Sequence, residues 1–202
     1  MARVALAEQR TLRRAQAHAA ARGAILEAAR RVAERDGARE LSLRGVAAEA
    51  GFAPAALYSY FSGKDDLLMA LAADDLTALA RTMRDAASRQ NGSGKLAAAS
   101  TAALAMFRDT EAMAAALSAL PATAGGSDAE RLFNGRMIAA LKVLSDASGN
   151  SANSRGGQCD VVLVAAAITG LAVLARSGRL AALGFSTEEI VQRLEARFAS
   201  RA

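Results

Sequence analysis

The sequence predicts an all-α protein, and three observations favour this fold class. Alanine and leucine dominate the composition, only two prolines occur, and aromatic residues make up 4% of the chain, so local propensity favours helix almost everywhere. Leu, Ile, Val, Met and Phe recur at helical spacing throughout, which is enough to build a hydrophobic core. Capping residues and helix breakers then divide the 202 residues into about nine helices, with no evident internal repeat.

The first three helices are predicted from residues that start or stop a helix. A helix with an apolar stripe ends at Gly37, a residue suited to a left-handed C-cap. Ser42 can cap a short second helix, which stops at Gly51. Pro54 suits the first turn of a third helix, because its missing N–H is a donor that a helix start leaves unpaired. The predicted bounds are about 19–36, 43–50 and 54–60.

Six more helices follow from the same logic. A serine three residues before an acidic residue resembles a capping box, in which each side chain bonds the backbone N–H of the other residue. Such pairs are Ser62 with Asp65, Ser127 with Glu130, and Ser186 with Glu189. Stretches rich in Gly, Ser and Asn predict loops at 91–94 and 148–157. The predicted helix bounds are about 62–89, 95–108, 110–120, 127–147, 158–176 and 186–202.

Positive charge is concentrated in the N-terminal third of the chain. Residues 1–64 contain 11 Lys and Arg against 6 Asp and Glu, a net charge of +5, whereas residues 65–202 contain 14 of each. A basic module beside a neutral body is typical of a polyanion-binding head. The alternative is a solvated basic tail, and for residues 1–18 order and disorder are equally compatible with the sequence.

The cysteine and histidine content disfavours several kinds of site. Cys159 is the only cysteine and His18 the only histidine, so we expect neither an intramolecular disulfide nor an ordinary zinc site. A redox role for Cys159 is the weaker alternative, because no activating neighbour is evident. We therefore expect no metal and no cofactor. An enzyme is also disfavoured, because the chain lacks an evident constellation of base, nucleophile or metal.

No segment predicts export or a membrane anchor. The first 20 residues lack the sustained apolar segment of a signal peptide. The longest apolar run, at 161–175, has 15 residues and is short for a membrane span. The expectation is a soluble cytoplasmic protein without a membrane partner.

The most specific pattern lies in residues 41–68, where two short predicted helices meet at a glycine. A helix-turn-helix needs a small residue where the helices touch, a residue that accepts positive φ in the turn, and an apolar residue that locks the second helix. Ala47, Gly51 and Leu57 meet these needs in order and at compatible spacing. Alanine-rich helical hairpins can imitate this pattern.

An aromatic and basic segment follows directly. Phe61 fits the core, whereas Tyr58 and Tyr60 carry hydroxyls that can reach phosphate oxygens while their rings pack on the domain. Lys64 opens the fourth predicted helix, where backbone N–H groups and the helix dipole also favour a phosphate. The segment indicates contacts with a nucleic-acid backbone, and burial of all the aromatic rings in the core is the alternative.

Residues 22–70 resemble the N-terminal domain of the TetR family of regulators. The likeness rests on Leu-Tyr-Ser-Tyr-Phe-Ser-Gly-Lys-Asp at 57–65, on the helix around Ile25, and on Gly37. It implies three DNA-binding helices, a linking fourth helix, and a bundle that binds a ligand and forms a homodimer. The expected domains are a basic arm (1–18), a helix-turn-helix DNA-binding domain (19–64) and a ligand-binding and dimerisation domain (65–202).

The resemblance implies which positions contact DNA. Arg44 is the best candidate for reading guanine, because its planar side chain can donate to O6 and N7 together. Many relatives carry Ser, Lys, Gly or Thr where residues 53–56 here are Ala-Pro-Ala-Ala. The alanine side chains at these positions can contact the methyl group of thymine, but they cannot read a base through hydrogen bonds. Discrimination between DNA sequences would therefore be weak or rest on DNA shape. The expected DNA-binding residues are Ser42, Arg44, Ala53, Ala55, Ala56, Tyr58, Ser59, Tyr60 and Lys64.

Two further sites are expected beyond residue 70. Soft or bulky residues on the central helices suit a small apolar ligand, and simple core filling is the alternative. The expected pocket residues are Met83, Met106, Phe107, Met113, Leu117, Phe133, Met137, Leu141 and Ile168, with Arg108, Asp109, Arg136 and Thr169 as candidate polar anchors. Stripes on the last two helices favour a four-helix dimer interface, although an intramolecular core would explain them equally well. They comprise Val161, Val164, Ala165, Ile168, Leu171, Ala172, Ala175, Ile190, Val191, Leu194 and Phe198.

The leading hypothesis is a DNA-binding transcription regulator, a repressor that a small apolar ligand releases from a palindromic operator. The alternative is a helical small-molecule-binding protein with little specific operator recognition, as the alanines at 53–56 would suggest.

Overall fold

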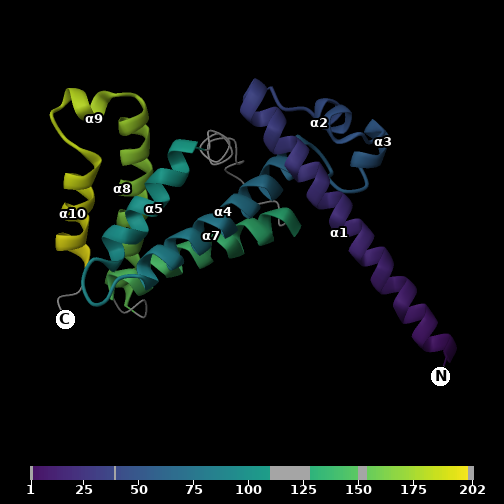
Figure 1. The fold of residues 1–202 in the computed structure, drawn as a ribbon, viewed down its shortest axis with the longest axis horizontal. Coiled ribbons are helices and arrows are strands. Elements are labelled where there is room, and N and C mark those ends of the chain that lie inside the picture. The colour runs from purple at the N-terminus through teal and green to yellow at the C-terminus, as the bar shows by residue number, and fades with distance from the viewer. Residues whose placement is uncertain (1, 39, 110–127, 150–153, 200–202) are drawn as a thin grey trace.

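In a computed structural model that describes residues 2–38, 40–109, 128–149 and 154–199, the chain forms helices and no strand within those ranges (Figure 1). The all-α prediction is confirmed. The helices are α1 (Ala2–Asp36), α2 (Leu43–Ala50), α3 (Pro54–Leu57), α4 (Lys64–Ser88), α5 (Lys95–Asp109), α7 (Asp128–Ser148), α8 (Arg155–Arg176), α9 (Arg179–Ala182) and α10 (Thr187–Phe198). The helix predicted at 110–120 and the predicted cap Ser127 lie outside the described residues.

Two hydrophobic cores divide the molecule into a head and a body. The head core joins the second half of α1 to α2, α3 and the start of α4, and Ile25, Val46, Leu57 and Leu67 are completely buried in it. The body core joins the rest of α4 to α5, α7, α8 and α10. Because α4 contributes to both cores, it is the structural link between head and body, and α7 packs along it (Figure 1).

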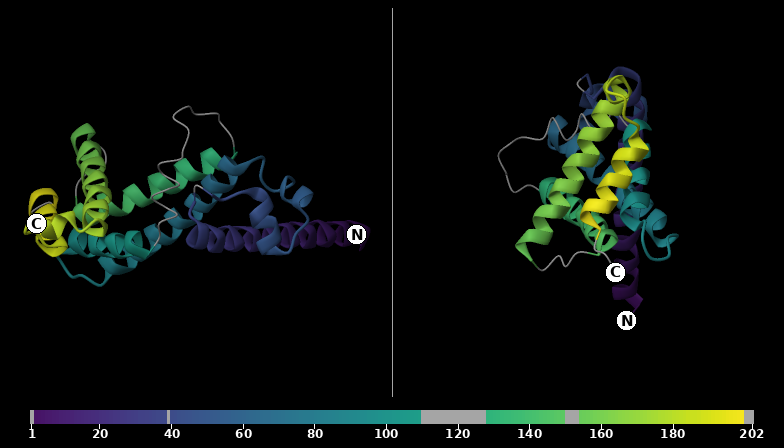
Figure 2. Two further views of the ribbon diagram at one scale, coloured as in Figure 1. Left: turned by 90° about the horizontal axis from the view of Figure 1, so that it is seen from above. Right: turned by 90° about the vertical axis from the view of Figure 1, so that its left-hand side faces the viewer.

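The first helix is much longer than the sequence predicted. The expected start was near residue 19, but α1 runs without a break from Ala2 to Asp36. Figure 2 shows its N-terminal half extending away from the rest of the molecule. The prediction failed because the apolar stripe begins only near Ile25, and a helix without an apolar face gives no periodic signal.

Several helix ends match the sequence prediction. Gly37 and Gly51 have positive φ angles of 89° and 73°, and Ser42 accepts a hydrogen bond from the backbone N–H of Gly45 at 3.1 Å. Ser186 and Glu189 form the predicted capping box.

Other ends differ from the prediction. Ser62 pairs with Asp66 rather than Asp65, and its backbone N–H donates to that carboxylate at 2.8 Å. The helix α3 ends at Leu57, and turns continue to Tyr60. Ser154 caps α8, which therefore begins three residues before the predicted start. The four-residue helix α9 was not predicted at all.

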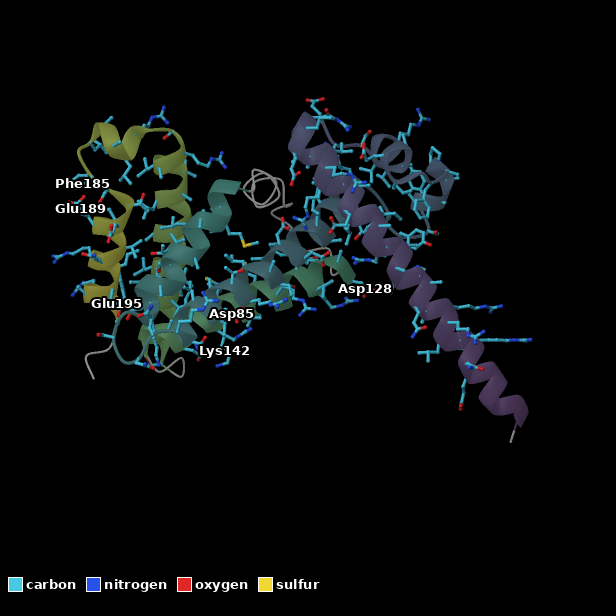
Figure 3. All side chains as sticks on the ribbon, in the orientation of Figure 1. Asp85, Asp128, Lys142, Phe185, Glu189 and Glu195 are labelled. Carbon is cyan, nitrogen blue, oxygen red and sulfur yellow. The ribbon has the colours of Figure 1, made fainter. Side chains whose placement is uncertain are left out.

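A carboxylate from α10 fixes one end of the body. Glu195 accepts hydrogen bonds from the backbone N–H groups of Gly94, at 2.8 Å, and Ala97, at 2.6 Å. These donors belong to the start of α5, where a helix leaves N–H groups unpaired and favours negative charge. Glu195 therefore ties the loop between α4 and α5 to the C-terminal helix (Figure 3).

The apolar helix α8 has two different faces. Its inner face, which includes Val164, Ile168 and Leu171, is buried in the body core. The outer face exposes Val162, Leu163 and Val173. With 22 residues and a mean hydropathy of 2.0 over 18 of them, α8 is long and apolar enough to cross a membrane by length and composition alone, and 28% of those 18 residues are buried in the fold.

Candidate DNA-binding surface and apolar cavity

The helices α2 and α3 form the helix-turn-helix that the sequence pattern predicts. Ala47 and Leu57 are completely buried where the two helices meet. Gly51 turns the chain with a φ of 73°, and the next backbone N–H, that of Phe52, donates to the carbonyl of Ala47 at 2.9 Å. This arrangement holds α3 at a fixed angle to α2 and leaves the outer side of both helices in solvent.

Arg44 and Tyr58 are exposed side chains among the residues expected to contact DNA. Tyr58 is 62% exposed, and Arg44 at the start of α2 is exposed as well. The structure gives neither side chain a hydrogen bond or ion pair to another described residue. Both side chains are therefore available to an external partner.

Most of the other residues expected to contact DNA either form local hydrogen bonds or are partly buried. Ser42 and Ser59 are exposed, but the Ser42 hydroxyl caps α2 and the Ser59 hydroxyl donates to the carbonyl of Ala56 at 2.7 Å. Lys64 is half-buried in the first turn of α4. The methyl groups at the start of α3 come from Ala53 and Ala55, which are exposed, and Ala56, which is half-buried.

The N-terminal helix supports the aromatic segment in a way that the sequence did not reveal. The ring of His18 stacks on that of Tyr60, with 4.6 Å between centroids. One helical turn later, the guanidinium of Arg22 lies 5.2 Å from the centre of the buried Phe61 ring, a cation–π contact. The i to i+4 spacing of His18 and Arg22 is the sequence signal that could have placed both side chains on one face of the helix.

A cluster of charges also fastens α2 to α1. Arg31 and Arg35 donate to the two carboxylate oxygens of Glu49 at 2.8 and 3.0 Å. Their hydrogen bonds lower the pKa of Glu49, which remains ionised at neutral pH. The cluster is exposed, so it orients α2 more than it stabilises the fold.

A cavity of about 160 Å³ lies in the body between α4, α5, α7 and α8. Five residues that the sequence assigned to a ligand pocket are in its wall, namely Met83, Phe107, Met137, Leu141 and Ile168. The other wall residues are Leu76, Leu79, Ala103, Ala140, Leu144, Ala165 and Thr169. Their leucines and alanines share the helical spacing of the core, so periodicity could place them on inner faces but could not show that a space remains between them.

The other expected pocket residues do not line this cavity. Phe133 is buried in the body core, and Met106 packs against that core. Arg136 is exposed and away from the wall. Among the anchors, only Thr169 lines the cavity, and its hydroxyl already donates to the carbonyl of Ala165 at 2.9 Å. The remaining expected residues, Met113, Leu117 and the side chains of Arg108 and Asp109, lie outside the described part of the structure.

The residues expected at a dimer interface pack within their own chain instead. Those fully buried in the body core are Val161, Val164, Ile168, Leu171, Ala172, Val191 and Leu194, and those packed against it are Ala165, Ala175, Ile190 and Phe198. Packing within the chain therefore accounts for the buried members of these stripes, and the dimer interface stays a prediction. The sequence could not separate the two because α8 is apolar on both faces.

Comparison with known protein families finds a match within the head. Residues 25–71 match the family of bacterial regulatory proteins described as the tetR family. This range contains the helix-turn-helix, the aromatic segment and the first eight residues of α4. No curated protein matches the chain.

Solved structures share the fold across nearly the whole chain at low sequence identity. A bacterial regulatory protein of the tetR family from Rhodococcus RHA1 is 18% identical, with a TM-score of 0.62 over 90% of this chain and 98% of that chain. The transcriptional regulator FadR from Bacillus subtilis, solved with stearoyl-CoA, is 15% identical, with a TM-score of 0.62 over 88% and 97%. The fatty acid degradation regulator FadR from Bacillus halodurans is 14% identical, with a TM-score of 0.62 over 89% and 94%. The match at residues 25–71 thus relates the head to bacterial regulatory proteins of the tetR family, and the solved structures show that the whole chain shares their fold.

Proposed function

We propose that this chain is a transcription regulator, a repressor that binds a palindromic operator as a homodimer and leaves it when a small apolar ligand enters the cavity. The observation that carries the proposal is the exposed pair Arg44 and Tyr58 on a compact helix-turn-helix. The pair offers one side chain for a base edge and one for a phosphate. The net charge of +5 in residues 1–64 supplies the attraction for DNA.

Recognition at the start of α3 rests on shape and methyl groups. Ala53 and Ala55 present methyl groups, which can contact thymine but cannot donate or accept a hydrogen bond. Arg44 is the side chain best suited to a bidentate contact with guanine. Specificity would thus come from a few Arg44 contacts and from the deformability of the operator.

The outer side of the body provides a surface for a second copy. We define the outer apolar patch as Val162, Leu163, Val173 and Leu174 of α8 together with Leu183 and Phe185, which follow α9; their exposed fractions range from 38% to 66%. Exposed apolar side chains gathered at one side of the body favour an interaction site. A two-fold pairing of these patches would present two heads to one operator, as a palindrome requires.

The cavity supports a small apolar ligand. Its wall contains leucine, methionine, phenylalanine and alanine with a single hydroxyl from Thr169, so the ligand would be held by shape and apolar contact. An apolar cavity of similar size in another protein binds benzene. A small aromatic or short acyl compound therefore fits this space without rearrangement of the wall.

The route from cavity to DNA runs along α4. Leu76 lines the cavity, and its neighbour Asp75 is paired with Arg30 of α1. A ligand that displaces the wall of α4 would shift this contact and with it the head. The coupling is reciprocal, so DNA should weaken ligand binding by the same factor by which ligand weakens DNA binding.

The test is selection from random duplex DNA, followed by fluorescence anisotropy with the selected duplex at several salt concentrations. A palindrome with a steep salt dependence is expected. Arg44→Ala should weaken binding by about 1–3 kcal/mol and relax the sequence preference at one position in each half-site. Tyr58→Phe should weaken all sequences alike.

The matched control is Arg89→Ala, which removes the same charge from the exposed end of α4 farthest from the head. It should leave operator affinity unchanged. Recovery of no preferred sequence, with the cavity still binding ligand, would support the alternative of a small-molecule-binding protein that lacks specific operator recognition.

A further inference from the structure

The N-terminal half of α1 contributes no buried side chain to the head among its described residues. Every described side chain from Glu8 to Ala20 is exposed, and the first completely buried side chain of α1 is that of Ile25. At 1.5 Å per residue, the part that precedes Ala21 extends about 29 Å from the head. Figures 1 and 2 show this segment projecting free of the other helices.

This segment lacks the features of a helix that packs against another protein. Leu12 is the only large apolar side chain between residues 8 and 20, so no apolar stripe exists for a partner helix. Residues 8–20 contain three arginines, Arg10, Arg13 and Arg14, and one acidic residue, Glu8. The structure gives none of the three arginines a hydrogen bond or ion pair to another described residue. The segment is therefore suited to a polyanion.

The register of α1 joins these cations to the DNA-binding surface. Arg10, Arg14, His18 and Arg22 follow one another at intervals of four residues and form a stripe along one side of the helix that turns by about 40° at each step. At that side His18 stacks on Tyr60 and Arg22 covers Phe61. Arg14 and Arg10 lie about 6 and 12 Å farther along the helix from His18. A single DNA strand presents a phosphate about every 3.4 Å of helix axis, so this distance spans three to four phosphates.

We propose that residues 8–18 of α1 are a second DNA-contacting element, which lies against the sugar-phosphate backbone outside the half-site read by the helix-turn-helix. Arg10 and Arg14 contact phosphates, and His18 holds the phenol ring of Tyr60 at the junction of the two contact regions. The inference rests on the proposed DNA binding and extends it to the flanks of the operator. Because these contacts go to phosphate, they add affinity without adding sequence preference.

The test compares two duplexes that contain the same selected operator. The short duplex ends at the bases covered by the helix-turn-helix, and the long one extends by about ten base pairs, one helical turn, at each end. The variant is the double substitution Arg10→Ala with Arg14→Ala in the full chain. Alanine favours helix, so α1 should persist, which circular dichroism verifies. The control is Arg84→Ala with Arg89→Ala, which removes the same charge from the far end of α4.

On the long duplex, the variant dimer loses four phosphate contacts. The slope of log affinity against log salt should fall by about 3.6, and a fourfold rise in salt should weaken the wild type by roughly a hundredfold more than the variant. On the short duplex, wild type and variant should bind alike. The preferred operator sequence should not change, and hydroxyl-radical protection of the flanks should disappear.

Equal affinity of wild type and variant for the long duplex would overturn the inference while leaving the proposed function intact. So would binding of the wild type, but not the variant, to anionic phospholipid vesicles with no difference on DNA, because the arm would then be a membrane-contacting element. Failure of the wild type to bind any selected duplex would instead contradict the proposed function itself.

Discussion

Asp75 of α4 is a buried carboxylate with only one satisfied oxygen. It is 1% exposed, one oxygen pairs with Arg30 of α1, and the other has no partner among the described residues. Burial raises the pKa of Asp75, and the hydrogen bond and charge of Arg30 partly offset that rise. Burial of the Asp75 carboxylate costs solvation free energy, and the ion pair with Arg30, which joins the head to the body, is the contact that offsets part of this cost.

We expect Arg30→Met to destabilise the protein by about 3 kcal/mol at pH 7, because it leaves a buried charge without a counter-charge. Since the folded-state pKa of Asp75 lies above its unfolded value, the group contributes most favourably below the unfolded pKa, and that contribution is lost as pH rises through the folded pKa. The deficit of Arg30→Met should therefore be smaller at pH 4 than at pH 7 in urea unfolding.

The double variant Arg30→Met with Asp75→Asn provides the control. Its deficit relative to the wild type should be smaller than that of Arg30→Met alone at pH 7, because a neutral amide costs less to bury than an unpaired carboxylate. A deficit of Arg30→Met that does not change between the two pH values would show that Asp75 carries no strained charge.

Single residues that shape the helix-turn-helix could be predicted because each has its own chemical signature. Caps and turns are indicated by Ser42, Gly51 and Pro54, and Tyr58 is an amphipathic ring in a basic segment. His18 and the Arg30–Asp75 pair could not be predicted in the same way. Their partners lie 42 and 45 positions away in the sequence, and only the packing of α1 on the head brings them together.

At the scale of elements, the apolar faces of the body helices were predictable, but their partners were not. Periodicity places Val164 and Ile168 on one side of α8, and it cannot tell whether that side meets α5 and α7 or a second copy. The wall of the cavity has the same ambiguity. It is formed where α4, α5, α7 and α8 fail to close completely, and this depends on how four helices cross rather than on any one of them.

We expect Ala140→Leu, on α7, to fill the cavity. Ala140 is 6% exposed and lines the space, so the added carbon atoms would occupy volume that a ligand needs. Benzene should raise the melting temperature of the wild type by differential scanning fluorimetry and should not raise that of the variant. Operator affinity without ligand should stay the same.

Ala105→Leu is the matched control for this variant, because Ala105 is an exposed residue of α5 that does not line the cavity. Its response to benzene should equal that of the wild type. A benzene response that survives in Ala140→Leu would place the binding site elsewhere in the protein.

At the scale of the whole molecule, the outer apolar patch is the surface that we propose for pairing two heads. Its residues come from α8 and the segment after α9, and they remain exposed in the single chain. Figure 3 shows Phe185 at the edge of this end of the body, far from the head. Dimerisation there would leave both DNA-binding surfaces free.

We expect Val173→Glu to convert a dimer into a monomer, because a charge at a residue that is 53% exposed in the single chain would be buried at the interface. Sedimentation velocity should show the change in mass, and operator affinity should fall steeply because a monomer contacts one half-site. Ile138→Glu, at a 65% exposed position of α7, should leave the dimer intact. An unchanged mass for Val173→Glu would exclude the patch as the dimer contact.

The division between head and body falls inside a continuous helix, and this limits how the two parts can be exchanged during evolution. The boundary expected at residue 64 would strip the head of Leu67, Leu68 and Leu71, which belong to its core. A functional crossover between relatives must therefore lie after residue 71, in the middle of α4. Any insertion there rotates the donor head by about 100° per residue around the recipient's axis. Recombination can give this protein a head of different specificity only when it preserves the rotational phase of α4 at this junction.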